Sequence, residues 1–396
     1  MFQLRPVRQL RATGRPVPGP RGGHVTRPAF DHPADHRWET RLIVVLAAVL
    51  TVFGLVSLYS AATFQAGAFR EVLKQLTAAG AGGVALLIAA GIDYRRWTRA
   101  AWWLLGLTVV LLIALLMPGA AVINGSRRWI SVAGVGFQPS ELARFSIVVW
   151  AAMIAAKKGD TIGQFTMGVF PVLLVTGFVA LLVLAEPNLS IATIIGLLGG
   201  VVLFTAGARI GQFLLVTVVA VFLAVGSIMA VPYRFTRAKC WLGLATDCAT
   251  GTNYQLDQAT KGFASGRLLG AGFGEGQLKL EYLPYATNDF LFSTIGEEWG
   301  FLGVLFVLAL FVLFCWLGFR IARTAPDPFG QYLATGLTAS VGLTALMHMA
   351  VNVGLMPTTG VTLPFMSAGR SSLMVTLVSV GVIVSVGRMR GRLGPP

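Results

Sequence analysis

The stretch FLGVLFVLALFVLFCWLGF, residues 301–319, is apolar throughout and contains no charged side chain. A helix of about 20 apolar residues is long enough to cross a lipid bilayer, so this stretch predicts a membrane span. The whole chain has the same character, because 55% of its 396 residues are hydrophobic, 12% are charged and the mean hydropathy is +0.74. We therefore predict an all-α polytopic membrane protein and exclude a soluble one.

Nine further apolar stretches of similar length give ten predicted spans. They lie at about 42–64, 75–92, 99–118, 140–156, 166–185, 189–206, 209–232, 290–319, 331–352 and 371–388. Residues 1–41 carry eight Arg among several Pro and Gly, without the short apolar core of a secretory signal. We predict a disordered basic tail over 1–41, a ten-helix domain over 42–388 and a short basic tail over 389–396.

The basic residues between the spans predict the orientation of the chain. Of the 31 Lys and Arg residues, 19 fall in one set of tails and loops and 12 in the other, giving formal charges of +13 and +2. Because the cytoplasmic side carries the excess of Lys and Arg, both tails are expected in the cytoplasm. The net charge of +15 then reflects contact with anionic membrane lipids, and we expect no nucleic-acid partner.

This orientation places residues 233–289 outside the membrane as one large loop. Cys240 and Cys248 both lie in this loop, eight residues apart, in an oxidising compartment. They are a candidate disulfide that holds the start of the loop, and two unpaired thiols are the alternative. Their spacing does not match a metal site.

The segment NGSRRWISVAGVGFQPSELARF, residues 124–145, brings charge to the start of the fourth span. Arg127 and Arg128 precede it, and Glu141 and Arg144 share one helix face at i, i+3. Glu141 and Arg144 predict a structural ion pair within this helix, and participation in a substrate site is compatible with that pair.

The segment LAEPNLS, residues 184–190, separates the fifth and sixth spans. Pro187 alone accounts for the break in the apolar run. We therefore predict Glu186 to be a solvated turn residue, with a group that lines a cavity as the alternative.

In the large loop, residues 253–284 are amphipathic and rich in Gly. Gln255 and Gln258, with Tyr254, have helical spacing and predict a short interfacial helix. The glycines that follow allow the backbone to approach a ligand closely. Three basic side chains are candidate phosphate partners, namely Lys261, Arg267 and Lys279.

Asp289 follows the loop directly and precedes the apolar residues Phe290, Leu291 and Phe292. A carboxylate at the polar edge of an apolar surface has a raised pKa, which favours a general base, although capping of the next helix explains Asp289 equally well. Glu297 and Glu298 lie about two turns deeper, where we expect paired groups facing the interior.

The segment NVGLMPTTGVTLPFMSAGRSSLM, residues 352–374, is interrupted by Pro and Gly. An irregular backbone at this depth is tolerated where it is buried in protein or lines a cavity. The segment therefore predicts one side of an outward-facing pocket, with candidate substrate contacts from Thr359, Ser367, Arg370 and Ser371.

Six of these motifs, in order along the chain, resemble the SEDS family of bacterial cell-wall synthesis, the RodA/FtsW proteins. They are RRWI with FQPSELARF (127–145), EPNLSIAT (186–193), YQLDQA (254–259), GAGFGEGQLKLEYLP (270–284), DFLFSTIGEEWGFLG (289–303) and MPTTGVTLPFMSAGRSSL (356–373). The similarity covers residues 42–388. QLKLEYLP and LPFMS are more similar to the division-type branch than to the elongation-type branch.

The resemblance implies a peptidoglycan glycosyltransferase of the bacterial cytoplasmic membrane, which joins lipid II units and releases undecaprenyl pyrophosphate. The essential aspartate of the family falls on Asp289, with the implied role of accepting the proton of the acceptor hydroxyl. The family's glutamate and basic residue fall on Glu141 and Arg144. The sequence departs from the family at Thr287 and Asn288, where His and Thr are usual.

The resemblance also implies binding partners, and two other functions remain as alternatives. The implied partners are lipid II, a class B penicillin-binding transpeptidase and other membrane proteins of division or elongation. The diphosphate needs cations, which outer Arg and Lys residues or a divalent ion such as Mg or Mn would supply. The alternatives are a lipid II flippase, for which paired inverted repeats are expected and are not seen in the sequence, and a non-catalytic division scaffold.

Overall fold

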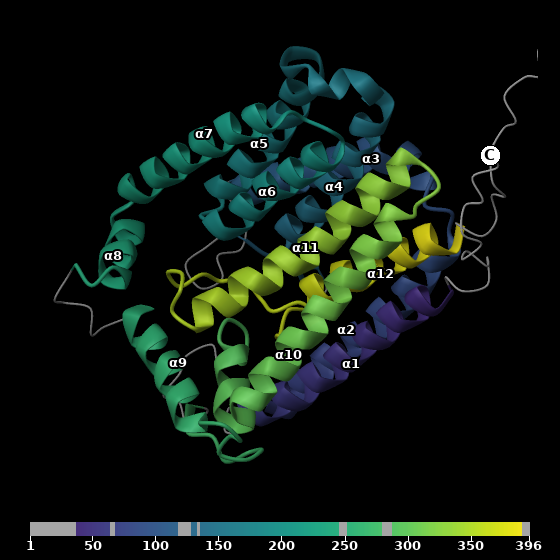
Figure 1. Ribbon diagram of the computed structural model, residues 1–396. Helices are drawn as coiled ribbons and strands as arrows, with labels where there is room; N and C mark the ends of the chain where they lie inside the picture. Colours follow the sequence, from purple (N-terminus) through teal and green to yellow (C-terminus); the bar gives the residue numbers. More distant parts are fainter. Residues whose placement is uncertain are drawn as a thin grey trace, which may run out of the picture. The chain divides into compact units, whose positions relative to one another are not determined.

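The computed structural model describes residues 37–63, 68–117, 128–132, 135–244, 252–278 and 287–389, which belong to one compact unit, His36–Pro396. Its helices and strands follow one another as α1 (Arg37–Ala62), α2 (Ala68–Gly91), α3 (Arg96–Leu116), β1 (Ile130–Val132), β2 (Val135–Phe137), α4 (Pro139–Lys158), η1 (Gly159–Gly163), η2 (Phe165–Val169), α5 (Phe170–Ala185), α6 (Leu189–Thr205), α7 (Ile210–Met229), α8 (Pro232–Trp241), α9 (Thr252–Gly266), α10 (Leu291–Arg323), α11 (Pro328–Asn352) and α12 (Arg370–Met389) (Figure 1).

Each of the ten predicted spans coincides with a long helix, and the all-α polytopic membrane fold is confirmed. Within the described residues, eight helices are long and apolar enough to cross a bilayer, and the shorter α6 is apolar as well. The number of ten spans and the place of the large loop remain predictions. So does the division into tails and domain, although α1 already begins at Arg37, inside the predicted tail.

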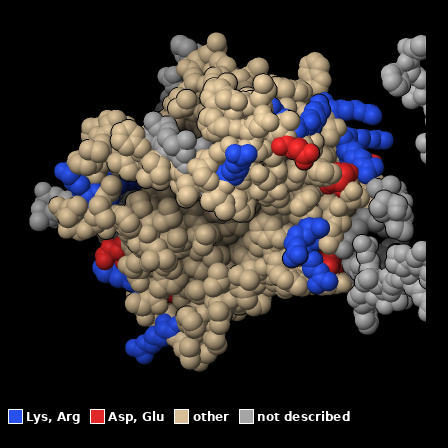
Figure 2. Space-filling view, turned by 45° about the horizontal axis from the view of Figure 1, so that its top comes forward, with Lys and Arg blue, Asp and Glu red and all other residues tan. Residues whose placement is uncertain are grey.

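The interior of the bundle is built on α4, α11 and α12. In its most apolar window α4 is 83% buried, and α11 and α12 are each 67% buried, whereas α2 and α3 are each 28% buried. The helices α2 and α12, α10 and α11, and α3 and α4 pack as pairs. The outer faces of α2, α3 and α10 remain apolar and exposed, as expected for surfaces that meet lipid tails. On the face drawn in Figure 2 charged side chains gather mainly toward the left and right margins, and the lower middle of the face is largely uncharged.

Helix α10 is interrupted close to its start. Gly300 has φ 64° and ψ −163°, outside the helical region, so the hydrogen-bond ladder breaks there. The segment after α9 replaces the lost bonds, because the amides of Phe301 and Leu302 donate to the carbonyls of Arg267 and Leu268 at 2.9 and 3.2 Å. Backbone groups in a membrane bundle need such partners, so the segment after α9 and the start of α10 form one unit.

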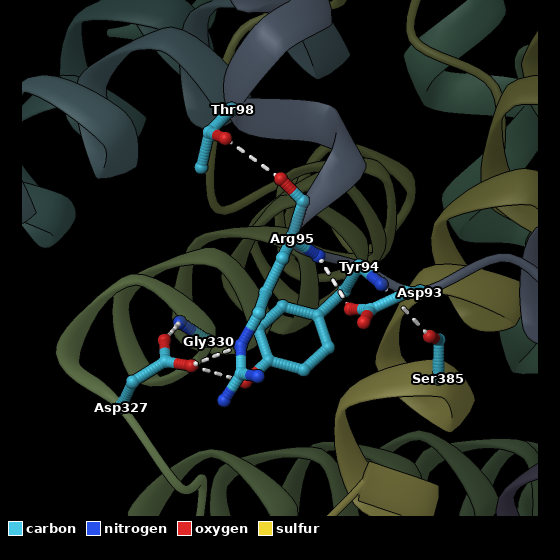
Figure 3. Close-up of polar contacts among 7 residues, drawn as sticks. All are labelled: Asp93, Tyr94, Arg95, Thr98, Asp327, Gly330 and Ser385. Carbon is cyan, nitrogen blue, oxygen red and sulfur yellow. Dashed lines mark hydrogen bonds and ion pairs between the residues drawn. The ribbon is translucent and has the colours of Figure 1, made fainter.

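The end of the bundle that the charge count assigns to the cytoplasm holds a polar cluster between α2, α3, α11 and α12 (Figure 3). The Tyr94 hydroxyl donates to the Asp327 carboxylate, and Arg95 Nε lies 3.0 Å from the same oxygen. Asp327 Oδ1 caps α11 by accepting from the Gly330 amide at 2.8 Å. On the far side, the Tyr94 amide donates to Ser385 Oγ at 3.1 Å, so this cluster joins four helices.

Candidate active site

Asp289 lies in the turn that leads into α10, at the end of the bundle opposite to the Tyr94 cluster. Its side chain is half-buried, while the next residue, Phe290, is buried. Burial raises the pKa of the Asp289 carboxyl from 3.8 to about 7, and the positive charges of Arg128 and Arg237 lower it. The raised pKa agrees with the sequence-based expectation and suits a general base near neutral pH.

Arg128 and Arg237 come from two different segments and act on Asp289 through their charge. Arg128 precedes β1 and donates from Nε to the Glu186 carbonyl at 3.1 Å and from Nη2 to the Pro187 carbonyl at 2.5 Å. Arg237 lies on α8 and donates from Nη1 to the Thr358 carbonyl at 3.2 Å. Hydrogen bonds to backbone carbonyls hold both guanidinium groups in place.

Glu186 is buried, with 1% of its surface exposed, so the prediction of a solvated turn residue is wrong. Arg128 binds the carbonyl of this same residue, which holds the turn against the segment before β1. Neither carboxylate oxygen of Glu186 has a hydrogen-bond partner among the described residues. Burial raises the pKa of Glu186 to about 8, and Arg128 lowers it, so the carboxyl is mostly protonated at neutral pH.

The segment between α11 and α12 lies against Asp289 on one side. A Cβ added to Gly360 would lie 3.8 Å from Asp289 Oδ2, and the Ala368 amide donates to the Thr287 carbonyl at 3.0 Å. Thr359 is half-buried, and its hydroxyl has no hydrogen-bond partner among the described residues. Thr359 is the candidate that directly precedes Gly360, the residue that faces the Asp289 carboxylate.

Three further candidates of this segment contact neighbouring parts of the protein, namely Ser367, Ser371 and Arg370. Ser367 Oγ accepts from the Leu363 amide at 3.0 Å and so closes a turn. Ser371 Oγ accepts from the Gln138 amide at 3.1 Å, which connects α12 to the start of α4. Arg370 is half-buried, and its Nη2 would lie 3.8 Å from a Cβ on Gly136.

Glu141 and Arg144 form the predicted ion pair in the first turn of α4, with both side chains buried. Arg144 Nη1 also donates to Thr344 Oγ1 of α11 at 2.5 Å. The pair therefore connects α4 to α11 inside the bundle. No hydrogen bond or ion pair within the described residues joins it to Asp289.

Glu297 and Glu298 are buried in α10, and both have the partners expected of interior carboxylates. Glu297 accepts from the amides of Gln277 and Leu278 at 2.8 and 3.1 Å, which holds the end of the Gly-rich segment. Glu298 accepts from Ser60 Oγ of α1 at 2.5 Å. Their contacts are those of residues that shape the loop.

The remaining candidates lie on α9 or outside the described residues. The predicted interfacial helix forms as α9, where Gln255 and Gln258 are half-buried and Lys261 pairs with Asp257 at 2.5 Å on an exposed face. Outside the described residues lie Arg127, Lys279 and Cys248. The bridge between Cys240 and Cys248 and the roles of Arg127 and Lys279 remain predictions.

No motif or spacing in the sequence pointed to Arg237 or Asn352 as site residues. Arg237 lies 52 positions before Asp289, in a loop whose path no local pattern predicts. Asn352 is fully buried at the end of α11 and donates from Nδ2 to the Asp289 carbonyl at 2.9 Å. A polar residue at the end of a predicted span was the only available signal for Asn352.

The fold and the site define a polytopic helical membrane protein with a half-buried aspartate at one end of the bundle, whose carboxyl feels the charges of two arginines. The family model of the FtsW, RodA and SpoVE proteins, described as "Cell cycle protein", matches residues 40–391. The chain belongs to this family.

Proteins of known name and structure show the same relationship. The chain is 36% identical over 357 residues to the probable peptidoglycan glycosyltransferase FtsW of Geobacter sulfurreducens, covering 88% of this chain and 95% of that protein. It is 33% identical over 353 residues to stage V sporulation protein E of Bacillus subtilis, covering 88% and 96%.

Two solved structures have the same fold. One, from work on the coordination of polymerization and crosslinking by a peptidoglycan synthase complex, matches with a TM-score of 0.75 and 28% identity over 88% of this chain and 98% of that chain. The rod shape determining protein RodA of Thermus thermophilus matches with a TM-score of 0.66 and 26% identity over 88% and 96%. As a member of this family the chain is a multi-pass protein of the inner membrane.

Proposed function

We propose that the protein is a peptidoglycan glycosyltransferase that polymerises lipid II at the outer face of the inner membrane during cell division. The observation that carries this proposal is Asp289, a half-buried carboxylate with a pKa of about 7 beside the charges of Arg128 and Arg237. The relatives named FtsW support the division branch.

The chemistry is the transfer of a sugar from a diphosphate to a hydroxyl group. The 4-hydroxyl oxygen of the acceptor sugar attacks the anomeric carbon of the donor, the bond from that carbon to the diphosphate oxygen breaks, and Asp289 takes the hydroxyl proton. A pKa close to the working pH lets the carboxylate accept that proton and release it afterwards.

The leaving diphosphate carries negative charge that grows as the bond breaks. Arg128 and Arg237 are fixed by backbone carbonyls, so they need little rearrangement when this charge develops. We assign to both the binding of the diphosphate. Replacement of either arginine by alanine is then expected to lower kcat strongly while the yield of folded protein changes little.

A divalent cation would also suit a diphosphate leaving group. Within the described residues, no group of three or more His, Cys, Asp and Glu side chains is close enough to hold a metal ion. Among these described residues no protein-held metal site is seen, and the mechanism is written through Asp289, Arg128 and Arg237 alone.

The partner belongs to the same proposal. The solved structure with the higher TM-score of the two comes from work on a complex that couples polymerization and crosslinking. We propose that this chain works with a class B penicillin-binding transpeptidase, and with further membrane proteins of division.

The test is polymerisation of fluorescent lipid II by the purified protein with its transpeptidase. Glycan polymer is expected from the wild type and from Asp257→Ala, which breaks an exposed pair on α9, and not from Asp289→Ala. Transfer of lipid II across vesicle membranes without polymer would show a flippase. Folded wild-type complex that makes no polymer would show a scaffold.

A further inference from the structure

The last turn of α11 carries a fully buried asparagine in contact with the candidate general base. Asn352 Nδ2 donates to the Asp289 carbonyl at 2.9 Å and to the His348 carbonyl at 2.9 Å. Its Oδ1 accepts from the amide and the hydroxyl of Ser293 at 3.1 and 2.8 Å. A side-chain amide has two donor hydrogens and two acceptor lone pairs, so the capacity of Asn352 is fully used.

These bonds join the end of α11 to the beginning of α10. The cap position of α10 is Phe290, which has no side-chain oxygen, so the first turn of α10 lacks a local side-chain cap. Asn352 supplies an acceptor to Ser293 from another helix. One side chain thus fixes the residue before Phe290 and the first turn after it.

His348, one turn earlier on α11, holds the opposite side of the site. It is buried, and its Nδ1 lies 2.7 Å from the carbonyl of Val361. Val361 follows Gly360, whose Cβ position would lie 3.8 Å from Asp289 Oδ2. The end of α11 therefore holds the backbone of Asp289 and also the segment that its carboxylate faces.

We infer that Asn352 is a positioning residue for Asp289: its amide fixes the Asp289 backbone so that the carboxylate stays in its half-buried place between α10 and the segment after α11. This inference rests on the proposed role of Asp289 as general base. Without Asn352, the turn at 287–290 loses a side-chain donor to its carbonyl and can move outward toward water. A displacement of about 1 Å is enough to reduce turnover roughly a hundredfold.

The same displacement changes the acid–base behaviour of the site. Asp289 has a raised pKa because it is desolvated, so exposure to water lowers that pKa. The base would then stay ionised at lower pH, and the acidic limb of the pH–rate profile would move to lower pH. Loss of a residue that only stabilises the fold would reduce the amount of active protein equally at every pH.

The experiment measures lipid II polymerisation by purified complexes carrying Asn352→Leu, which preserves side-chain volume, or Asn352→Ala. Each is normalised to folded complex by size-exclusion chromatography. We expect kcat to fall about a hundredfold, KM for lipid II to stay within about threefold, and the acidic limb to move to lower pH. The control is Ser385→Ala, which removes a buried hydroxyl at the other end of the bundle and should leave kcat and the limb unchanged.

Three outcomes contradict the inference. They are an unchanged kcat, a lower yield of folded protein with an unchanged pH profile, and failure of both variants to fold, which would make Asn352 a residue of folding alone. Asp289→Asn, assayed alongside, separates this inference from the proposal on which it rests. If Asp289→Asn polymerises lipid II normally, the proposed function itself fails, whatever the Asn352 variants do.

Discussion

Arg128 binds the backbone of Glu186 and not its carboxylate. Arg128 Nε donates to the Glu186 carbonyl oxygen at 3.1 Å. Neither carboxylate oxygen of Glu186 has a hydrogen-bond partner among the described residues. The turn between α5 and α6 therefore holds Arg128 near Asp289 but contains an unsatisfied acid. Such a group is costly to ionise, and its effect on stability is measurable.

The first prediction concerns this acid and pH. Burial raises the pKa of folded Glu186 to about 8 from 4.5, so the folded state holds a proton that the unfolded state releases above pH 4.5. Stability then falls as pH rises from about 5 to 8, by at most about 1.4 kcal/mol per pH unit. Glu186→Gln removes this loss, so its thermal midpoint should exceed that of the wild type at pH 8 and approach it at pH 5.

The control for this experiment is Glu275→Gln, which changes an exposed carboxylate and should have the same small effect at both pH values. An equal shift for Glu186→Gln at pH 5 and pH 8 would show that Glu186 is ionised in the folded protein.

The second prediction concerns the buried pair of Glu141 and Arg144. Arg144→Ala leaves an unpaired carboxylate inside the bundle and should reduce the free energy of unfolding by about 3–5 kcal/mol. The double variant Glu141→Gln with Arg144→Met leaves no buried charge and should recover much of that loss. Lys261→Ala breaks an exposed pair and should cost about 1 kcal/mol at most. A double variant as unstable as the single one contradicts this account.

The third prediction concerns the break in α10. A Cβ on Gly300 would lie 2.3 Å from the Gly270 amide nitrogen, and Gly300 has φ 64°, so Gly300→Ala is blocked by contact and by conformation. We expect little folded protein from Gly300→Ala. Gly83→Ala in α2 has open space around its Cβ and should fold normally. Equal yields of both variants in fluorescence-detected size-exclusion chromatography would show that the break in α10 is not required.

The fourth prediction concerns the cluster of Figure 3. Tyr94→Phe removes the hydroxyl that donates to Asp327 and keeps the ring that stacks on Phe329. The half-buried Asp327 carboxylate loses a donor, at a cost of about 1–3 kcal/mol. The pKa of Asp327 is lowered by its hydrogen bonds with Tyr94, Gly330 and Arg95, which outweigh the opposing effect of burial.

The sign of the pH effect follows from that lowered pKa. The ionised form of Asp327 stabilises the fold above its unfolded pKa, and the contribution is lost as pH falls. The difference between Tyr94→Phe and the wild type should therefore shrink in acid. A thermal-melt difference that is the same at pH 4 and pH 7 contradicts this explanation.

Local patterns in the sequence predict the membrane fold, but they predict only part of the site. Runs of apolar residues located each long helix, with starts that differ by up to seven residues at α2, and the spacing of Glu141 and Arg144 predicted their pair, because both signals are confined to one helix. The apolar run predicts one continuous span over 290–319, whereas α10 breaks at Gly300. Only contact with the 267–272 segment shows why glycine is needed there.

The same limit explains the errors at the site. Glu186 follows an apolar helix and precedes a proline, as an exposed turn residue does, yet it is buried and its carbonyl is bound by Arg128, 58 positions earlier. Asn352 contacts Asp289 across 63 positions. Asp289 itself was identified through the family motif around it, because capping of α10 explained its position equally well.

The central claim is that Asp289 is the general base of lipid II polymerisation. The most direct measurement is the initial rate of polymer formation by the Asp289→Asn complex, with bound lipid II quantified in the same sample. Asparagine keeps the shape of the side chain and cannot accept the proton, so the account predicts a rate reduced at least about a thousandfold with lipid II binding within about threefold of wild type. A rate within tenfold of the wild type at equal binding would contradict it.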